Sequence, residues 1–342
     1  MSMFLDALRY LGYVLIFPGF LFCFLGGMLL VGIDRKMVAK MQKRVGPPIL
    51  QPFYDFLKLC GKECIIPAVA SSRTIFMGAP LLGLAALVVI QLFIPVFNFT
   101  AFSGMADIIV ILYLLLIPAV SIIVGGAASG SPYAGVGLSR EMVTIIACEL
   151  PLVMVLLAVG KTVGNEMGTG LVFSFTQIAD YQLANGSLIT AKISMIPTAL
   201  AMLLIIPGET GNHPFDTAEA ETEICEGMLA EYSGPPLAVF KLSHGVKMLT
   251  MTSIFVALFF GGIGTGIENF VGLFLSGGAA GALTLILSII VMFLLCILLT
   301  IVSISFVHAV TARLRIEQVF KFYWTVVAGL ALIGLVLAWY GL

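Results

Sequence analysis

Long stretches without a charged residue constrain this chain more than any other feature of its sequence. Residues 74–106 and 108–139 contain no Asp, Glu, Lys or Arg, and residues 318–342 contain only Lys321. About 20 apolar residues are enough for an α-helix to cross a lipid bilayer, so each stretch predicts at least one span. Only 10% of the 342 residues are charged and the mean hydropathy is +1.13, values that exclude an ordinary soluble domain.

The hydropathy pattern predicts an all-α polytopic membrane protein with about eight transmembrane helices in a single domain, residues 1–342. The predicted spans are approximately 11–33, 75–97, 108–127, 141–160, 192–208, 246–264, 280–304 and 322–341. The first apolar stretch exceeds about twenty residues and no small-residue cleavage site follows it, so it is kept as a span. No internal repeat is visible, which argues against an inverted-repeat transporter.

The distribution of basic residues predicts the orientation of these helices. The odd-numbered loops carry 14 of the 17 Lys and Arg residues, and the other side carries Arg9, Lys161 and Lys192. Loops rich in Lys and Arg stay in the cytoplasm. We therefore expect cytoplasmic odd-numbered loops and both termini outside a prokaryotic inner membrane.

The six cysteines and three histidines are dispersed along the chain. Cys60 and Cys64 are the only close pair, but their spacing is not C-x-x-C and no His lies nearby. We expect no catalytic residue, metal site or cofactor in this chain, and no nucleic-acid partner. If the protein serves redox chemistry, the electrons travel in another subunit.

The first cytoplasmic loop combines a basic segment with a predicted surface helix. Residues 34–44 read DRKMVAKMQKR, and the breaker Gly46-Pro47-Pro48 follows. From Phe53 to Cys60 apolar residues recur at helical spacing, which predicts an amphipathic helix that either anchors to the membrane surface or lies under a partner subunit. The residues predicted to dock a partner are Arg35, Lys36, Lys43, Arg44, Asp55, Lys58, Lys62 and, in the fifth loop, His213.

Carboxylates gather in the fifth loop. Seven of the 18 acidic residues lie between Glu209 and Glu231, and no Lys or Arg interrupts them. A continuous helix would place Glu219, Glu223 and Glu226 on one face, where like charges repel and titrate as a coupled set. Such a set can load and release protons. The alternatives are a solvated acidic loop that docks a basic partner and, for Glu209 and Asp216, helix capping.

The fourth predicted span contains two further acids. Glu141 opens it, and Glu149 lies about two turns deeper, just before Pro151. A carboxylate inside a span is costly and indicates a functional site. Eight helical residues separate the two acids by roughly 12 Å, so water or acids of the fifth loop would have to bridge them. The structural alternative is a protonated Glu149 that bonds neighbouring helices, or one that pairs with Arg140.

Four ordered motifs carry a resemblance to a known family. They are DRKM…Q.RVGP…QP..D..KL..KE in the first loop, R…CE in the fourth span, PFD…EAE.E…G…EYSG in the fifth loop and R.R.EQ…W near the end. With them the chain resembles the complex I subunit 1 family, the membrane subunit that joins the soluble and membrane arms of respiratory complex I and its hydrogenase relatives. The resemblance implies an eight-helix fold, a surface helix in the first loop and an acidic, water-filled path leading inward from the junction.

The resemblance also assigns residues. Glu149 matches the span-four acid of that path, and Arg140 matches an Arg nine positions before it. The residues implied for the ion-translocation path are Glu141, Glu149, Asp216, Glu219, Glu221, Glu223, Glu226 and Glu231. The supporting charges are Arg140, Arg313 and Arg315.

Two departures distinguish branches of the family. The turn RVGPPILQP lacks the longer insertion of the quinone-reducing members, and Asn212-His213 stands where those members have Arg-Ala. Both features resemble energy-converting, membrane-bound nickel–iron hydrogenases, so no quinone is expected as a ligand. The resemblance implies a membrane-anchoring junction subunit that couples ferredoxin-driven proton reduction to proton or sodium translocation.

This hypothesis implies partners that carry the redox chemistry. Iron–sulfur clusters and a nickel–iron centre would lie in soluble hydrogenase large and small subunits and in iron–sulfur subunits, with antiporter-like subunits beside the chain in the lipid bilayer. Two alternatives stay open. One is the same subunit in a quinone-reducing, complex I-type NADH dehydrogenase, and the other is a stand-alone secondary ion transporter with Glu149 as its ion site.

Overall fold

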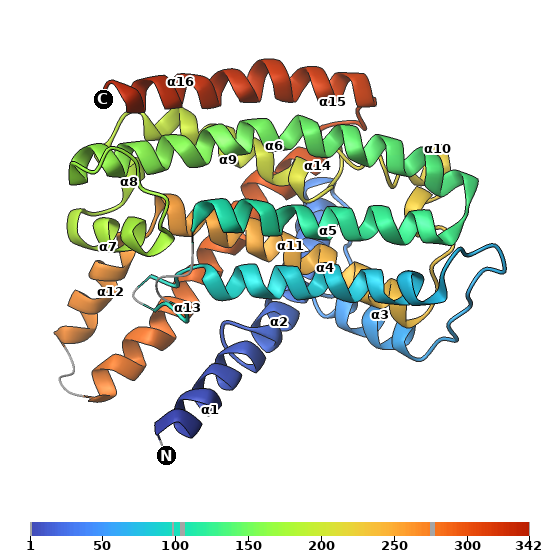
Figure 1. Ribbon diagram of the computed structural model, residues 1–342, viewed down its shortest axis with the longest axis horizontal. Coiled ribbons are helices and arrows are strands. Elements are labelled where there is room, and N and C mark those ends of the chain that lie inside the picture. The colour runs from blue at the N-terminus through green and yellow to red at the C-terminus, as the bar shows by residue number, and fades with distance from the viewer. Residues whose placement is uncertain (1, 98, 103–106, 274–277, 342) are drawn as a thin grey trace.

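The computed structural model describes residues 2–97, 99–102, 107–273 and 278–341, without the side chains of residues 2–8, 221–222 and 278–279. These residues form a bundle of helices (Figure 1). Within them, extended pairing is limited to two isolated bridges, Val96 with Phe99 and Asp107 with Ser174. The predicted fold class, an all-α polytopic membrane protein, is confirmed.

The helices follow one another along the whole chain. In the first half they are α1 (Ser2–Leu15), α2 (Phe20–Met41), α3 (Gln51–Cys60), α4 (Arg73–Phe93), α5 (Ile108–Ser129) and α6 (Pro132–Met167). Next come α7 (Phe175–Asn185), α8 (Leu188–Ala191), α9 (Met195–Glu209), α10 (Glu221–Ile224), the 3₁₀-helix η1 (Gly227–Leu229) and α11 (Pro235–Phe259). The last are α12 (Ile263–Gly272), α13 (Gly278–Leu299), the π-helix η2 (Thr300–Ser305), α14 (Phe306–Val310), α15 (Ile316–Phe322), the π-helix η3 (Tyr323–Val327) and α16 (Ala328–Trp339).

Seven stretches of the described chain are long and apolar enough to cross a membrane. They are Arg9–Met41, Arg73–Phe93, Ile108–Ser129, Pro132–Met167, Pro235–Phe259, Ala280–Val310 and Ile316–Trp339. The remaining predicted span, 192–208, forms the 15-residue helix α9. A helix of this length rises about 22 Å, less than the ~30 Å hydrocarbon core of a bilayer. α9 packs against α6, α11 and α16, and its Ile196 and Leu200 are half exposed, so it lies in the bundle beside the longer spans with one face open.

Two helices begin well before the predicted boundaries. α6 starts at Pro132 rather than near 141, and α11 starts at Pro235 rather than near 246. Proline at the first helical position supplies a suitable backbone angle and lacks only an N–H that would have no helical partner there. The earlier start of α11 places Lys241 and Lys247 on a helix. Lys241, counted among the basic residues of the fifth loop, is therefore helical, whereas Lys247 already lay within the predicted span 246–264.

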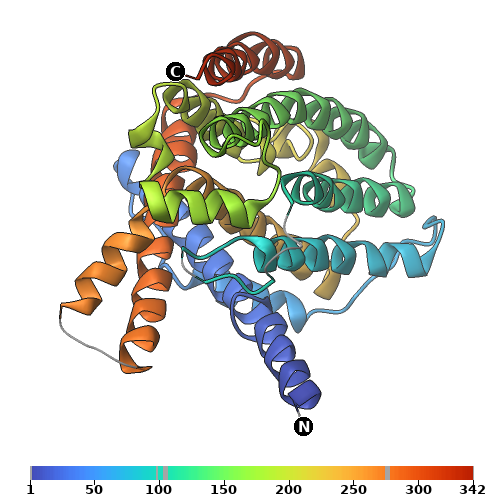
Figure 2. The ribbon, with the colours of Figure 1, turned by 60° about the vertical axis from the view of Figure 1, so that its left-hand side comes forward.

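The centre of the bundle is α11. Every side chain of this helix from Met248 to Phe259 is buried, and α11 packs against α2, α4, α9 and α13. Figure 1 shows α4, α5, α6 and α16 running side by side along the long axis, whereas α2 crosses them obliquely. In Figure 2, α12 and α13 form a pair at the edge of the bundle.

The loops predicted to be cytoplasmic gather at one end of the bundle. There α3, α10 and the start of α15 lie together, whereas α7, α8 and the C-terminus lie at the opposite end (Figure 1). The predicted surface helix is α3, whose Phe53 and Phe56 rings pack on Phe24 of α2 with centroids 5.8 and 5.2 Å apart. Leu57, predicted on the same apolar face, is instead exposed together with Tyr54.

Candidate functional site

A cavity of about 440 Å³ lies between α2, α3, α6, α11 and the fifth loop. The charged residues that line it are Arg35, Asp55, Lys58, Lys62, Glu141, Glu209, Asp216, Glu219, Glu226, Lys241 and Lys247. Six carboxylates thus face five cations. Apolar residues, among them Phe56, Phe215 and Phe240, complete the wall. Because buried charged groups require polar partners, the charged part of the wall suits water molecules.

The exposed end of the cavity is formed by the first loop. Arg35 Nη1 lies 3.2 Å from Asp55 Oδ2, and the Gln51 amide donates a 2.9 Å hydrogen bond to Asp55 Oδ1. Lys58 and Lys62 of the same segment also line the cavity. Four of the residues predicted to dock a partner therefore lie at this mouth, whereas Lys36, Lys43 and Arg44 lie outside it.

The inner end of the cavity holds an enclosed ion pair. Lys247 Nζ of α11 lies 3.2 Å from Glu209 Oε1, and the two side chains are only 12% and 11% exposed. Glu141 of α6 lines the same region and interacts electrostatically with both. Neither Lys247 nor Glu209 was among the residues predicted for the ion path. The signal that would have found Lys247 is a lysine inside a membrane span, where an ionisable residue indicates function.

The fifth loop brings a titratable carboxyl group into this cavity. Burial is the largest of the causes that raise the pKa of Glu219 to about 7. The neighbouring carboxylates of Glu141, Glu226 and Asp216 act in the same direction, and Lys241 opposes them. Such a group exchanges its proton near neutral pH. Of the eight residues predicted for the ion path, Glu141, Asp216, Glu219 and Glu226 meet in the cavity.

Glu219, Glu223 and Glu226 do not share a continuous helix. α10 spans only Glu221–Ile224, because Cys225 and Glu226 adopt left-handed backbone angles, with φ of 50° and 65°. Glu219 thus precedes α10, Glu223 lies on it and Glu226 follows it. Glu219 and Glu226 line the cavity, whereas Glu223 points to the other side of the loop and binds Arg140.

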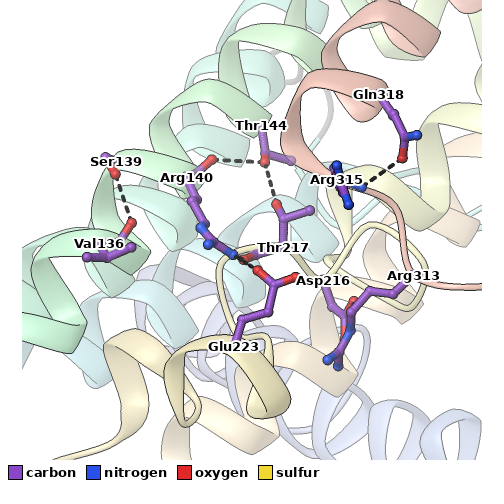
Figure 3. A network of polar contacts seen from close by, with 10 residues as sticks. All are labelled: Val136, Ser139, Arg140, Thr144, Asp216, Thr217, Glu223, Arg313, Arg315 and Gln318. Atoms are coloured by element: carbon purple, nitrogen blue, oxygen red, sulfur yellow. Dashed lines mark hydrogen bonds and ion pairs between the residues drawn. The ribbon is translucent and has the colours of Figure 1, made fainter.

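A polar network holds the outer side of the fifth loop (Figure 3). Arg140 Nη1 donates to Glu223 Oε2 at 2.5 Å and to the Thr217 carbonyl oxygen at 3.2 Å. Arg313 binds Asp216 through two hydrogen bonds, from Nε at 3.0 Å and from Nη2 at 2.6 Å. We refer to these four side chains, Arg140, Asp216, Glu223 and Arg313, as the loop clamp. Arg140 pairs with Glu223, so it is not the partner of Glu149.

The remaining predicted residues lie away from both features. Glu149 is partly exposed on the face of α6 that also exposes Met142 and Ile146, so the acid is less enclosed than the resemblance implied. Its carboxyl group interacts electrostatically with Glu209. Glu231 is exposed on the fifth loop. The side chain of Glu221 lies outside the described residues.

Arg315 and His213 also lie outside the cavity. Arg315 is exposed and, with Arg140, Glu223 and Arg313 of the loop clamp, lines a hollow of about 300 Å³. The His213 ring stacks on His308 of α14, with centroids 4.9 Å apart. Burial is the main cause that lowers the pKa of His213. The neighbouring His308 and Arg313 lower it further, whereas Asp216 raises it. His213 therefore packs the fifth loop against α14, although it was predicted to dock a partner.

The fold and the cavity together define a multi-pass membrane protein with an ionisable interior. The family model described as NADH dehydrogenase matches residues 14–339. Hydrogenase-4 component C of Escherichia coli is 35% identical over 234 residues, which cover 68% of this chain and 70% of that protein. A subunit of the NADH-quinone oxidoreductase of Pelagibacter ubique is 30% identical over 319 residues, which cover 90% of this chain and 88% of that protein.

A solved structure extends the comparison to nearly the whole chain. It is a membrane-bound sulfane sulfur reductase, described as an archaeal respiratory membrane complex, with a TM-score of 0.82 and 28% identity over 99% of this chain and all of the matched chain. The chain belongs to the complex I subunit 1 family, near its hydrogenase branch. It is a membrane subunit of a respiratory or hydrogenase-type complex and has partner subunits.

Proposed function

We propose that the chain is the ion-translocating junction subunit of an energy-converting hydrogenase. It would anchor the soluble hydrogenase and iron–sulfur subunits and couple ferredoxin-driven proton reduction to proton or sodium translocation. The observation that carries this proposal is the cavity, which leads from the exposed Arg35–Asp55 pair to the enclosed Lys247–Glu209 pair. Ionisable residues inside a membrane protein mark ion pathways because their enclosure is otherwise costly.

The acids of the cavity supply the steps of a proton path. Glu219 exchanges a proton near pH 7 and so loads from the cytoplasmic side. Glu141 and Glu149 are roughly 12 Å apart along α6, too far for direct transfer. Glu209 of α9 interacts electrostatically with both, which supports it as the bridging acid.

The loop clamp offers a means of coupling. It fixes the fifth loop to α6 and to the segment before α15 at the end of the bundle where the soluble partners would dock. A charge gained in a partner near this loop would act on Asp216 and Glu223 and, through the loop, on Glu219. A positive charge near a carboxyl group favours its ionisation, so proton release further along would follow.

The outer face of α6 supports a membrane partner beyond Glu149. Met142 and Ile146 expose 50% and 58% of their surface on the same face. A carboxyl group on this face needs cover from lipid by a polar partner. An antiporter-like subunit at this position would receive the ion.

The orientation of the chain follows from the same proposal. If the end of the bundle that contains α3 faces the cytoplasm, both termini lie outside.

Two sequence features favour the hydrogenase branch over a quinone-reducing complex. They are the compact turn RVGPPILQP and Asn212-His213 before the fifth-loop motif. Membership of a family of multisubunit complexes likewise favours a complex subunit over a stand-alone transporter.

Purification of the intact complex in mild detergent tests the proposed function. We expect soluble subunits to co-purify with stoichiometric nickel and with iron in iron–sulfur clusters, and the reconstituted complex to move ions when reduced ferredoxin is supplied. Bound quinone in a complex without nickel would overturn the hydrogenase assignment.

A further inference from the structure

α11 presents a row of nitrogen-bearing side chains, two lysines and a histidine, to the cavity. Lys241, His244 and Lys247 follow one another at intervals of three residues, so they share one face of the helix, and all three line the cavity. His244 Nε2 lies 3.1 Å from Asn212 Oδ1, and Lys241 interacts electrostatically with Glu219. The innermost member, Lys247, is the one held in an enclosed ion pair.

Lys247 faces two carboxyl groups from two different helices. Glu209 of α9 binds it directly, and Glu141 of α6 interacts with it electrostatically, as does the neighbouring thiol of Cys148. One ammonium group can neutralise one carboxylate. Because an unpaired charge in an enclosed site is costly, the other carboxyl group must carry a proton. The position of Lys247 therefore decides which of the two acids is protonated.

The 3.2 Å contact pairs Lys247 with Glu209. Charge balance among the three groups then makes Glu141 the acid that holds the proton. The lysine side chain has a flexible four-carbon stem, so its ammonium group can change partner by rotating about side-chain bonds. If it turns toward Glu141, Glu209 loses its counter-ion and becomes the site that takes the proton.

We propose that Lys247 is a positioning residue that alternates between Glu209 and Glu141 and so directs the proton from one to the other. The proton leaves the Glu141 carboxyl group and joins the Glu209 carboxylate, while the ammonium group keeps its own protons and moves to Glu141. The net charge of the three groups is zero before and after the step. The direction of this step rests on the proposed function, whereas the role of Lys247 as counter-ion does not.

An apolar carbodiimide tests this inference in the intact complex. Dicyclohexylcarbodiimide modifies protonated carboxyl groups within membranes, and mass spectrometry of peptides locates the adduct. In the unmodified complex at pH 7 we expect adducts on Glu141 and few on Glu209. In Lys247→Met the adducts on Glu209 should rise about tenfold, because removal of a charge at ion-pair distance shifts protonation by at least that factor.

Three further variants make the test specific. Lys247→Arg keeps the charge and should keep Glu209 unmodified. Lys241→Met removes a charge from the same face of α11 and should leave Glu209 unchanged. If Lys247→Met does not assemble, the double variant Lys247→Met/Glu209→Gln replaces it. This variant removes both charges of the pair, so we expect it to assemble and to keep the adducts on Glu141. Equal modification of Glu209 in the unmodified complex and in Lys247→Met would overturn the inference.

Ion transport, measured beside the labelling, separates this inference from the proposed function. Lys247→Met should lose transport and Lys247→Arg should retain it. Lost transport without a change at Glu209 would refute the counter-ion role and leave the ion path intact. Altered labelling with full transport would support the counter-ion role and refute the path through Glu209.

Discussion

The cavity and the loop clamp share the fifth loop but differ in how their charges are balanced. In the clamp each carboxylate has its own guanidinium, Asp216 with Arg313 and Glu223 with Arg140. In the cavity Lys247 serves two acids, and Glu219 has a pKa of about 7. Matched pairs fix a structure, whereas unmatched, enclosed carboxyl groups exchange protons. One acidic segment can thus contain residues that hold the loop and residues that move an ion.

The largest effect is expected at the inner end of the cavity. Glu141→Gln removes the proton carrier beside Lys247, so ion transport in proteoliposomes should fall roughly a hundredfold, as is usual when a proton-transfer group is lost. Assembly of the complex should be normal. Glu268→Gln, on the exposed part of α12, is the matched control and should transport normally. Normal ion transport by an assembled Glu141→Gln complex would contradict the claim that the acids of the cavity, unlike those of the clamp, move ions.

A second effect is expected in the clamp and concerns stability. Arg313→Ala leaves Asp216 without its two charge-assisted hydrogen bonds in a partly enclosed site. We expect a loss of about 2 kcal/mol in unfolding free energy, less than for a fully buried pair. Denaturant unfolding of the purified complex measures it. Asp216→Asn should lower the unfolding free energy by a similar amount. An unchanged denaturation midpoint in both variants would refute the claim that this pair holds the fifth loop in place.

Titration of Glu219 should make stability depend on pH. Its pKa in the folded protein, about 7, lies above the ordinary value of 4.5, so folding favours the protonated form. The contribution of Glu219 to stability is therefore complete below about pH 4.5 and is lost as the pH rises through about 7. The difference in melting temperature between the unmodified complex and Glu219→Gln should shrink or reverse over this range. Parallel pH curves for the two proteins would contradict the assignment.

The smallest effect is expected for the exposed pair of the clamp. Arg140 and Glu223 expose 26% and 52% of their side chains, and exposed ion pairs contribute little. Arg140→Ala should change the unfolding free energy by about 0.5 kcal/mol, measured beside Arg313→Ala in the same denaturant series. A larger loss than in Arg313→Ala would reverse the order of the two pairs.

Hydropathy and motif order were sufficient to predict the class of fold. Apolar length identified the seven long spans and the position of the shorter helix α9. It did not give the early start of α11 at Pro235, because Lys241 and the residues before it were attributed to a loop although they lie on the helix.

The candidate site was predicted in composition but not in arrangement. A continuous helix would have placed Glu219, Glu223 and Glu226 together, but α10 begins only at Glu221 and ends at a left-handed turn, and Glu223 binds Arg140 on the other side of the loop. Such a turn leaves no clear pattern in the sequence, since neither residue is a glycine. The pairing of Lys247 with Glu209 joins residues 38 positions apart and required the packing of α9 against α11.

Paired measurements on Glu219→Gln and Glu223→Gln test the division of the fifth loop most directly. Each assembled complex is reconstituted in vesicles, and the ions moved per electron pair are measured. The two acids are four residues apart, yet one lines the cavity and the other binds Arg140. We expect Glu219→Gln to lose at least about tenfold in this ratio and Glu223→Gln to stay within about twofold. Equal losses, or a larger loss in Glu223→Gln, would contradict the account.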